Sequence, residues 1–245
     1  MTNKFNGERL RQARIYNKIS INDLAELLNI SKQAISQYET QNITPDFNKM
    51  RLIVDKLNFP SSYFFQEDIY DIKPSTTYFR ALLSANRCER NQQDIKIKHL
   101  AVIHNILDKY IEFPVLNLPP IPDLLKTNLT KDNIEKIAQI VREYWELGNK
   151  PINDIIYILE KNGIIVTAYG TENNIDAYSK KIKIDNKDSY IIVLSTTKES
   201  AVRSNFDAAH ELGHIILHDW NMNLEDLTSK EFKEIEQQAN DFAAA

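Results

Sequence analysis

The stretch AAHELGHIILH, which runs from Ala208 to His218, holds three of the five histidines of this 245-residue chain. Residues four apart share one face of a helix, so the rings of His210 and His214 can point at the same ion. Glu211 lies beside them, where a carboxylate can take a proton from a metal-bound water without binding the metal. The H-E-x-x-H spacing therefore predicts a zinc site on a helix. The simpler alternative is a buried helix with one paired histidine and an exposed glutamate.

A catalytic zinc ion needs three protein ligands and one open position, so two histidines are not enough. His218 lies about 12 Å from His210 along a straight helix, which is too far for one ion to bind both rings. The segment EIEQQANDFAAA predicts a further helix, on which Glu236 lies next to the buried stripe and Glu234 points away. Glu236 is therefore the expected third ligand, and His218 is expected to support a ligand or to pack.

Other polar residues near the motif have less specific expected roles. Asp207 and Asp219 flank the motif helix and could orient a ligating ring. Tyr178 is the residue we consider as a hydrogen-bond donor to the transition state. His99 and His104 fall on a separate amphipathic segment, and we expect them to be structural.

The segments around the motif predict a mixed domain of helices and strands. Three β-rich runs, IIVTAY, DAYSKKIKI and SYIIVLST, precede the motif, and amphipathic helical segments flank them. An open edge of SYIIVLST could pair with an extended peptide substrate. The sequence TSKE at 228–231 has the spacing of a capping box and predicts the start of the final helix. The chain as a whole is expected to be mainly α with a small β-sheet.

Residues 6–65 predict a run of short helices. Ser20 and Ser31 are expected N-caps of two of them, which the tight NIS turn joins. This pattern predicts an all-α helix-turn-helix domain, whose second helix enters the major groove of DNA. That helix has a polar face, on which glutamine can bond adenine and lysine can bond guanine or phosphate. The candidate DNA-binding residues on this face are Lys32, Gln33, Ser36 and Gln37. The alternative is a small helical bundle with a solvated polar face.

Composition and charge exclude several classes of protein. No apolar run approaches the roughly 18 residues of a membrane span, and the amino-terminal residues lack the apolar core of a secretion signal. Cys88 is the single cysteine, which excludes an internal disulfide and fits a reducing cytoplasm. Residues 1–65 hold nine Lys or Arg and six Asp or Glu, whereas residues 205–245 hold two and nine. This asymmetry indicates two parts with different partners.

The first 60 residues or so resemble the phage-repressor-like family of helix-turn-helix domains. The resemblance lies in LRQAR, DLAELLNISKQAISQYE and MRLIVDKLNF. It implies that Lys32, Gln33 and Gln37 read bases in double-stranded DNA, and it makes Arg11 and Asn42 candidate phosphate contacts. Single modules of this kind usually act as dimers, so we expect a homodimer.

Residues 130–245 resemble the ImmA/IrrE family of zinc-dependent metalloendopeptidases. The resemblance lies in AAHELGHIILH, the later EQQANDFAAA, and the upstream YWELGNKPINDIIYILEKNGIIV and NIDAYSKKIKI. It implies zinc as the cofactor, His210, His214 and Glu236 as its ligands, and Glu211 as general base and acid. In the family the last helix continues into further apolar residues and a proline. Here it stops at FAAA, so we expect a carboxyl-terminal truncation.

The resemblances together imply a DNA-binding transcriptional regulator, active in a phage or stress response, that cleaves a repressor or itself. A non-catalytic zinc sensor and an antitoxin-like module that binds DNA and protein stay open as alternatives. The expected domains are a helix-turn-helix domain at 1–66, a connector with a long helix at 67–122, and an α+β zincin-like metallopeptidase domain at 123–245. We expect the protein in the cytoplasm and away from membranes.

Overall fold

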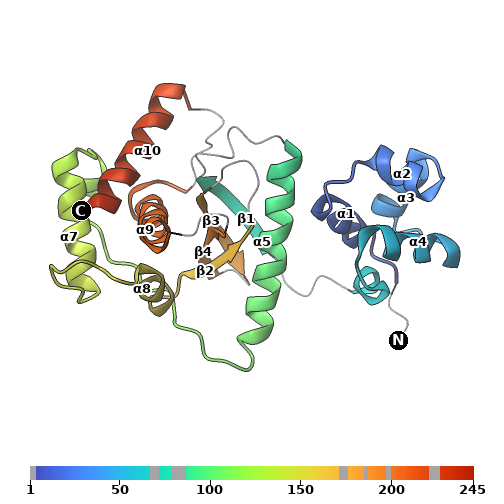
Figure 1. The fold of residues 1–245 in the computed structure, drawn as a ribbon, viewed down its shortest axis with the longest axis horizontal. Helices are drawn as coiled ribbons and strands as arrows, with labels where there is room; N and C mark the ends of the chain where they lie inside the picture. Colours follow the sequence, from blue (N-terminus) through green and yellow to red (C-terminus); the bar gives the residue numbers. More distant parts are fainter. Residues whose placement is uncertain are drawn as a thin grey trace. The chain divides into compact units, whose positions relative to one another are not determined.

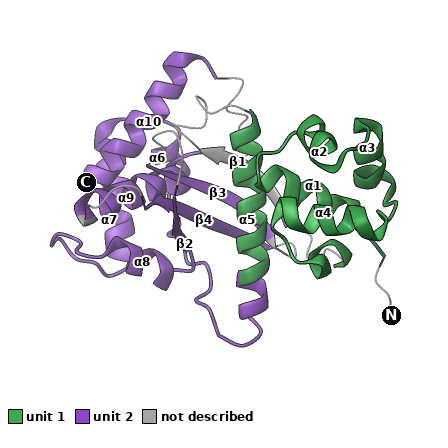
Figure 2. Ribbon diagram, turned by 45° about the vertical axis from the view of Figure 1, so that its right-hand side comes forward, with its two compact units in different colours: residues 1–71, 85–103 green, residues 72–84, 104–245 purple. Residues whose placement is uncertain are grey.

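The computed structural model describes residues 4–66, 72–78, 87–170, 176–184, 187–196, 200–220 and 227–245 (Figure 1). The chain divides into two compact units (Figure 2). Unit 1 comprises residues 1–71 and 85–103, and unit 2 comprises residues 72–84 and 104–245. The predicted organisation, an all-α helix-turn-helix domain followed by an α+β domain, is confirmed.

Unit 1 is built from short helices around one apolar core. They are α1 (Gly7–Tyr16), α2 (Ile21–Leu28), α3 (Lys32–Gln41), α4 (Phe47–Leu57), the 3-10 helix η1 (Ser61–Phe65) and most of α5 (Arg87–Leu107). The fully buried side chains of this core come from every element before α5: Phe5, Leu10, Ala13, Leu24, Leu28, Ile35, Ile53, Leu57 and Phe64. The helices before α5 have at most 11 residues and are too short to be stable alone, so this shared core is what holds them.

Polar side chains set the ends of the two helices of the motif. The hydroxyl of Ser20 accepts from the backbone N–H of Asp23, and the hydroxyl of Ser31 accepts from that of Ala34. Both predicted N-caps are therefore confirmed. Between the helices, Asn29 adopts a left-handed conformation with φ of 51°, which asparagine tolerates better than most residues. This conformation ends α2 and makes the sharp turn into α3.

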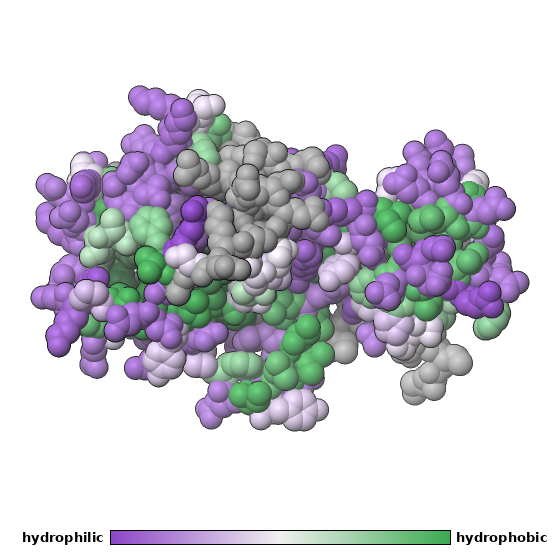
Figure 3. Space-filling model, viewed as in Figure 1, coloured by the Kyte–Doolittle hydropathy of each residue, from purple (hydrophilic) through white to green (hydrophobic). Residues whose placement is uncertain are grey.

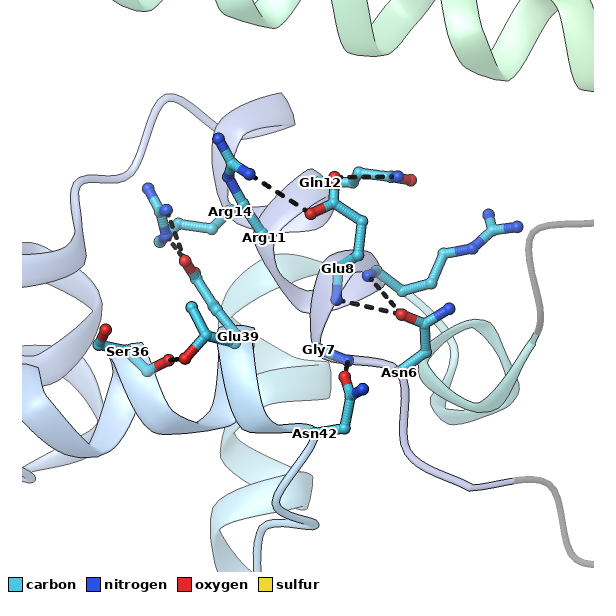
Figure 4. A network of polar contacts seen from close by, with 11 residues as sticks. Asn6, Gly7, Glu8, Arg11, Gln12, Arg14, Ser36, Glu39 and Asn42 are labelled. Carbon is cyan, nitrogen blue, oxygen red and sulfur yellow. Dashed lines mark hydrogen bonds and ion pairs between the residues drawn. The ribbon is translucent and has the colours of Figure 1, made fainter. Parts of the chain in front are cut away.

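One buried ion pair joins α1 to α3 (Figure 4). The guanidinium of Arg14 donates from Nε to Glu39 Oε1 at 2.6 Å and from its terminal nitrogen to Glu39 Oε2 at 2.9 Å. Its remaining nitrogen donates to the carbonyl oxygen of Ile19 at 3.0 Å. The two side chains are only 10% and 4% exposed. This geometry fixes how α3 lies against α1, and therefore where the outer face of α3 points.

Unit 2 contains a four-stranded sheet, as far as the described residues show, in the order β1-β3-β4-β2. Its strands are β1 (Ile72–Tyr78), β2 (Ile165–Tyr169), β3 (Ala177–Ile184) and β4 (Lys187–Ser195). β3 is antiparallel to both β1 and β4, and β2 is parallel to β4. The expected open edge on SYIIVLST is wrong, because that segment forms β4 and both of its edges are paired.

Strand β1 comes from the segment that was expected to be a connector. Its sequence, IKPSTTY, contains a proline and several polar residues and gives no clear strand signal. Pairing with β3 supplies the order that the local sequence does not, and a register shift follows Pro74. The structure therefore shares residues 67–122 between the two units instead of setting them apart.

The helices of unit 2 are α6 (Asp123–Lys126), α7 (Lys131–Tyr144), α8 (Ile155–Lys161), α9 (Ala201–Leu217) and α10 (Ser229–Ala244). α9 packs against β3, β4, α8 and α10, so it lies at the centre of the unit. The TSKE capping box is confirmed, since Thr228 and Glu231 bond to each other's backbone N–H at the start of α10. No helix in the described part of the chain is both long and apolar enough to cross a membrane.

Apolar side chains also reach the surface near the end of α5 and in the segment that follows (Figure 3). The exposed residues of this patch in unit 2 are Ile106, Leu107, Tyr110, Ile111 and Val115. Val115 and Tyr110 are 85% and 82% exposed, which is unusual for side chains that gain from leaving water.

We predict that Arg14→Leu lowers the free energy of unfolding of unit 1 by about 3–5 kcal/mol, because it leaves the Glu39 carboxylate buried without its partner. Urea denaturation of the full chain, followed by hydrogen exchange in peptides from residues 7–41, measures this change. Arg11→Leu is the matched control, since the Arg11–Glu8 pair is 56% and 42% exposed and should contribute less than about 1 kcal/mol. Equal effects of the two substitutions would contradict the assignment.

Candidate metal centre

Helices α9 and α10 together bring two imidazoles and one carboxylate to a single point. His210 and His214 lie one turn apart on α9, and their Nε2 atoms are 3.1 Å apart. Glu236 on α10 places Oε2 at 3.6 Å from His210 Nε2 and Oε1 at 3.5 Å from His214 Nε2. The three predicted ligands therefore converge from two separate segments, and they are the group among the described residues that could hold a metal ion.

The separation of the two imidazole nitrogens is close to an edge of a zinc coordination tetrahedron. Zinc binds imidazole nitrogen and carboxylate oxygen at about 2.0–2.2 Å, so two ligand atoms in a tetrahedron lie about 3.3–3.5 Å apart. The two Nε2 atoms lie 3.1 Å apart, slightly closer than that value, and each oxygen of Glu236 lies opposite one ring, Oε2 at 3.6 Å from His210 and Oε1 at 3.5 Å from His214. Three protein ligands leave a fourth position open, as catalytic zinc sites require.

The carboxylate of Glu236 fits a metal because it is buried and has no hydrogen bond. The residue is only 6% exposed, and neither of its oxygens has a hydrogen-bond partner. Its contacts to the two histidines are longer than ordinary hydrogen bonds. A buried carboxylate without compensation costs several kcal/mol, and a bound cation is the partner that this set of donors would suit.

A close contact between α9 and α10 makes this convergence possible. Gly213 lies inside the motif, and a Cβ atom there would meet the Cα and carbonyl oxygen of Ala239 and the ring of Phe242, each at 3.2 Å. The small residues at 213 and 239 therefore let the helices approach closely enough for Glu236 to reach both rings. Gly213, the glycine of the HELGH motif, is therefore needed for the three side chains to come together.

Burial and nearby charges shift the pKa values of the two histidines in opposite directions. The pKa of His214 lies well below its ordinary value, because burial and the neighbouring His218 and His210 disfavour a positive ring. The ring is therefore neutral and able to bind a metal. Burial alone would lower the pKa of His210 as well, but Glu236 and Glu211 outweigh it and raise that pKa.

Glu211 is buried beside the ligands and is held by one hydroxyl group. The hydroxyl of Ser179, on β3, donates to Glu211 Oε2 at 2.5 Å, and neither residue is more than 4% exposed. Burial raises the pKa of Glu211 to about 7, although His210 and Ser179 act in the opposite direction. A carboxylate with a pKa near neutrality can both accept and return a proton, as a general base and acid must.

Sequence reasoning missed three residues around the site. Asn240 places Oδ1 at 3.0 Å from His210 Nδ1, and Gln238 places Oε1 at 3.1 Å from His218 Nε2. Asn240 lies four residues after Glu236 and so on its face of the helix, which was the available signal. Ser179 had no such signal, because its place opposite Glu211 depends on how β3 lies against α9.

The other histidines and Tyr178, which the sequence singled out, contact neighbouring side chains of the fold. His218 lies at 3.0 Å from His214, Nδ1 to Nδ1, which agrees with the expected supporting role. Tyr178 is fully buried and its hydroxyl meets that of Tyr169, so it is not positioned at the open side of a cleft. His99 bonds to Tyr63 at 3.0 Å, and His104 stacks on Phe113.

The outer face of α3 in unit 1 presents the predicted DNA-binding residues. Lys32, Gln33, Ser36 and Gln37 are all exposed on this helix, which begins at Lys32. Of the two candidate phosphate contacts, Arg11 is exposed, whereas Asn42 uses its side-chain oxygen to accept from the backbone N–H of Gly7 at 2.7 Å (Figure 4). The side chain of Asn42 therefore joins α3 to the start of α1.

Two parts of the chain each match a known protein-family model. Residues 7–68 match a family model described as a helix-turn-helix domain, and residues 165–245 match a peptidase family model described as an IrrE N-terminal-like domain. The second match covers the three ligand residues and Glu211. No curated protein and no solved structure matches the chain. The fusion predicted from the sequence is confirmed.

We predict that Glu236→Leu abolishes zinc binding and stabilises the metal-free protein by about 1–4 kcal/mol, since it removes a buried carboxylate that has no hydrogen bond. Metal content after dialysis measures the first effect. Urea unfolding without metal, followed by the fluorescence of Trp145 and Trp220 in unit 2, measures the second. Glu234→Leu, at an exposed position two residues earlier on the same helix, is the control and should change neither. Retained zinc in Glu236→Leu would show that Glu236 is not a ligand.

Proposed function

We propose that this chain, which joins a helix-turn-helix domain to an IrrE N-terminal-like domain, is a DNA-bound regulator that hydrolyses a peptide bond at a zinc centre. The observation that carries the proposal is the buried, unpartnered carboxylate of Glu236 facing two imidazoles, with Glu211 beside them. The substrate would be a partner repressor or a second segment of this chain, and the protein would act in the cytoplasm.

The residues of the site divide the work of hydrolysis between them. His210, His214 and Glu236 would hold the ion, which when bound supplies a Lewis acid for the peptide carbonyl and its attacking water. Glu211 takes a proton from that water as the oxygen attacks the carbonyl carbon. It then returns the proton to the leaving nitrogen as the carbon–nitrogen bond breaks. Ser179 holds the carboxylate of Glu211 in place.

The helix-turn-helix unit supplies DNA binding, for which its exposed α3 face is suited. Glutamine pairs with adenine through two hydrogen bonds in the major groove, so Gln33 and Gln37 are the proposed base readers. Lys32 and Ser36 complete the face and can contact guanine or phosphate. One such module makes few contacts, so we propose a homodimer, and the exposed apolar patch near the end of α5 offers a surface for it.

A second candidate function is a regulator whose zinc domain senses a signal without cleaving anything. The short hydrogen bond from Ser179 to Glu211 favours it, because that bond occupies one of the two carboxylate oxygens that could accept a proton from water. The two functions share the same ligands and differ in whether Glu211 moves a proton.

We predict that Glu211→Gln keeps zinc bound and lowers peptide cleavage by about 10²–10⁴-fold, since an amide cannot accept the proton of water. Cleavage of a randomised peptide library by the zinc-loaded full chain, read by mass spectrometry, measures the loss. Glu234→Gln is the control and should cleave as the native chain does. If the native chain binds zinc but cuts no peptide, the non-catalytic function is supported instead.

We predict that Gln33→Ala and Gln37→Ala each weaken binding to the selected operator by about 5- to 100-fold, because each removes a two-bond contact to one base. The operator is first selected from random duplex DNA with the native chain, and affinities are then compared at one fixed salt concentration. The matched control is Gln139→Ala, an exposed glutamine on α7 of unit 2. Losses that are equal on operator and random DNA would contradict base reading.

A further inference from the structure

Three side chains, those of His214, His218 and Gln238, form a row of hydrogen bonds that leads away from the candidate metal centre. His214 Nδ1 lies 3.0 Å from His218 Nδ1, and His218 Nε2 lies 3.1 Å from Gln238 Oε1. The opposite nitrogen of His214, Nε2, faces Glu236. One end of this row is therefore the amide oxygen of Gln238 on α10, and the other end is His214 Nε2, a ligand atom of the proposed zinc site.

The chemistry of these groups determines where each proton lies. An amide oxygen only accepts, so His218 Nε2 must carry a hydrogen and donate it to Gln238. A neutral imidazole has one N–H, so His218 Nδ1 then has a lone pair and accepts from His214 Nδ1. His214 in turn has its hydrogen on Nδ1, which leaves the lone pair of Nε2 directed at the metal position. The reverse set of protons would put a hydrogen there and block a metal.

The other histidine ligand reaches the same result by a direct contact. His210 Nδ1 lies 3.0 Å from Asn240 Oδ1, which again accepts a hydrogen bond, so in the neutral ring the lone pair is on Nε2. Asn240, Gln238 and Glu236 all lie on α10. One helix thus provides a ligand and the oxygens that orient both histidine ligands, in one case directly and in the other through His218.

The backbone places the ring of His218 between His214 and Gln238. It follows the last residue of α9 and has an extended conformation, with φ of −106° and ψ of 153°. Its ring therefore leaves the helical path and contacts both His214 and α10. His218 and Gln238 also line a pocket of about 590 Å³, together with Ile215, Trp220 and Ile235, so the row can be reached from a side that the three ligands do not line.

We propose that His218 and Gln238 are positioning residues that fix the ring and the proton of His214 for zinc. The proposal rests on the zinc site of the proposed function and not on peptide cleavage. A hydrogen-bonded partner of a ligating histidine typically accounts for about 10–100-fold in metal affinity. Neither residue touches the ion or the reacting atoms.

The test measures the zinc affinity of the full chain by competition with a chelator, without any activity assay. We expect His218→Phe and Gln238→Met to weaken zinc binding by about 10–100-fold, because each keeps the bulk and removes the hydrogen bond. Gln238→Glu retains an acceptor and should restore affinity to within about threefold of the native chain. Gln237→Met, next to it on the exposed side of α10, is the control and should have no effect.

Two further readouts separate positioning from simple packing. The visible spectrum of the cobalt-substituted chain should change in His218→Phe and Gln238→Met and stay native in Gln238→Glu. Free imidazole, which has the ring that this substitution removes, should restore metal affinity to His218→Gly but not to Gln238→Met. Native zinc affinity in both His218→Phe and Gln238→Met, with binding lost in Glu236→Leu, would overturn the positioning role of His218 and Gln238. The proposed zinc site itself would stand. Absence of zinc binding by the native chain would overturn both.

Discussion

The contact between α9 and α10 is the constraint on which the candidate metal centre depends. The two helices meet where Gly213 faces Ala239, and a side chain as small as a methyl group at 213 would already be crowded. Because they are this close, the carboxylate of Glu236 reaches two imidazole nitrogens on the neighbouring helix. The rest of unit 2 supports this contact: the sheet and α8 pack against α9, and α7 packs against α10.

The same contact explains why so much of the site comes from one helix. α10 carries Glu236, Gln238 and Asn240, and its start is fixed by the capping box at Thr228. A small rotation of α10 would move the ligand and both orienting oxygens together, so the site is either assembled or lost as a whole. A centre built in this way depends on helix docking more than on any single hydrogen bond.

Helical periodicity in the sequence was enough to predict which three side chains come together, but not their surroundings. Spacing places His210 and His214 on one face and Glu236 beside the buried stripe, and the structure brings all three together. The N-caps Ser20 and Ser31 could also be predicted, because each serine bonds to a backbone N–H only three residues later in the chain. Ser179, the pairing of β1 and the Arg14–Glu39 pair were not predictable, because each joins segments far apart in the chain through register or docking angle.

Three glutamates are buried in the described parts of the chain, and their partners distinguish what each one does. Glu39 is bound by both arms of the Arg14 guanidinium, so its charge is neutralised and its role is structural. Glu211 has one hydroxyl partner, which holds the carboxylate in position but leaves its pKa near 7, where a proton can be exchanged. Glu236 has no hydrogen-bond partner at all, an arrangement that is unfavourable unless a cation completes it. Burial is common to the three side chains, so it does not identify a functional carboxylate. What distinguishes the three is the number of hydrogen bonds that the carboxylate accepts: two for Glu39, one for Glu211 and none for Glu236.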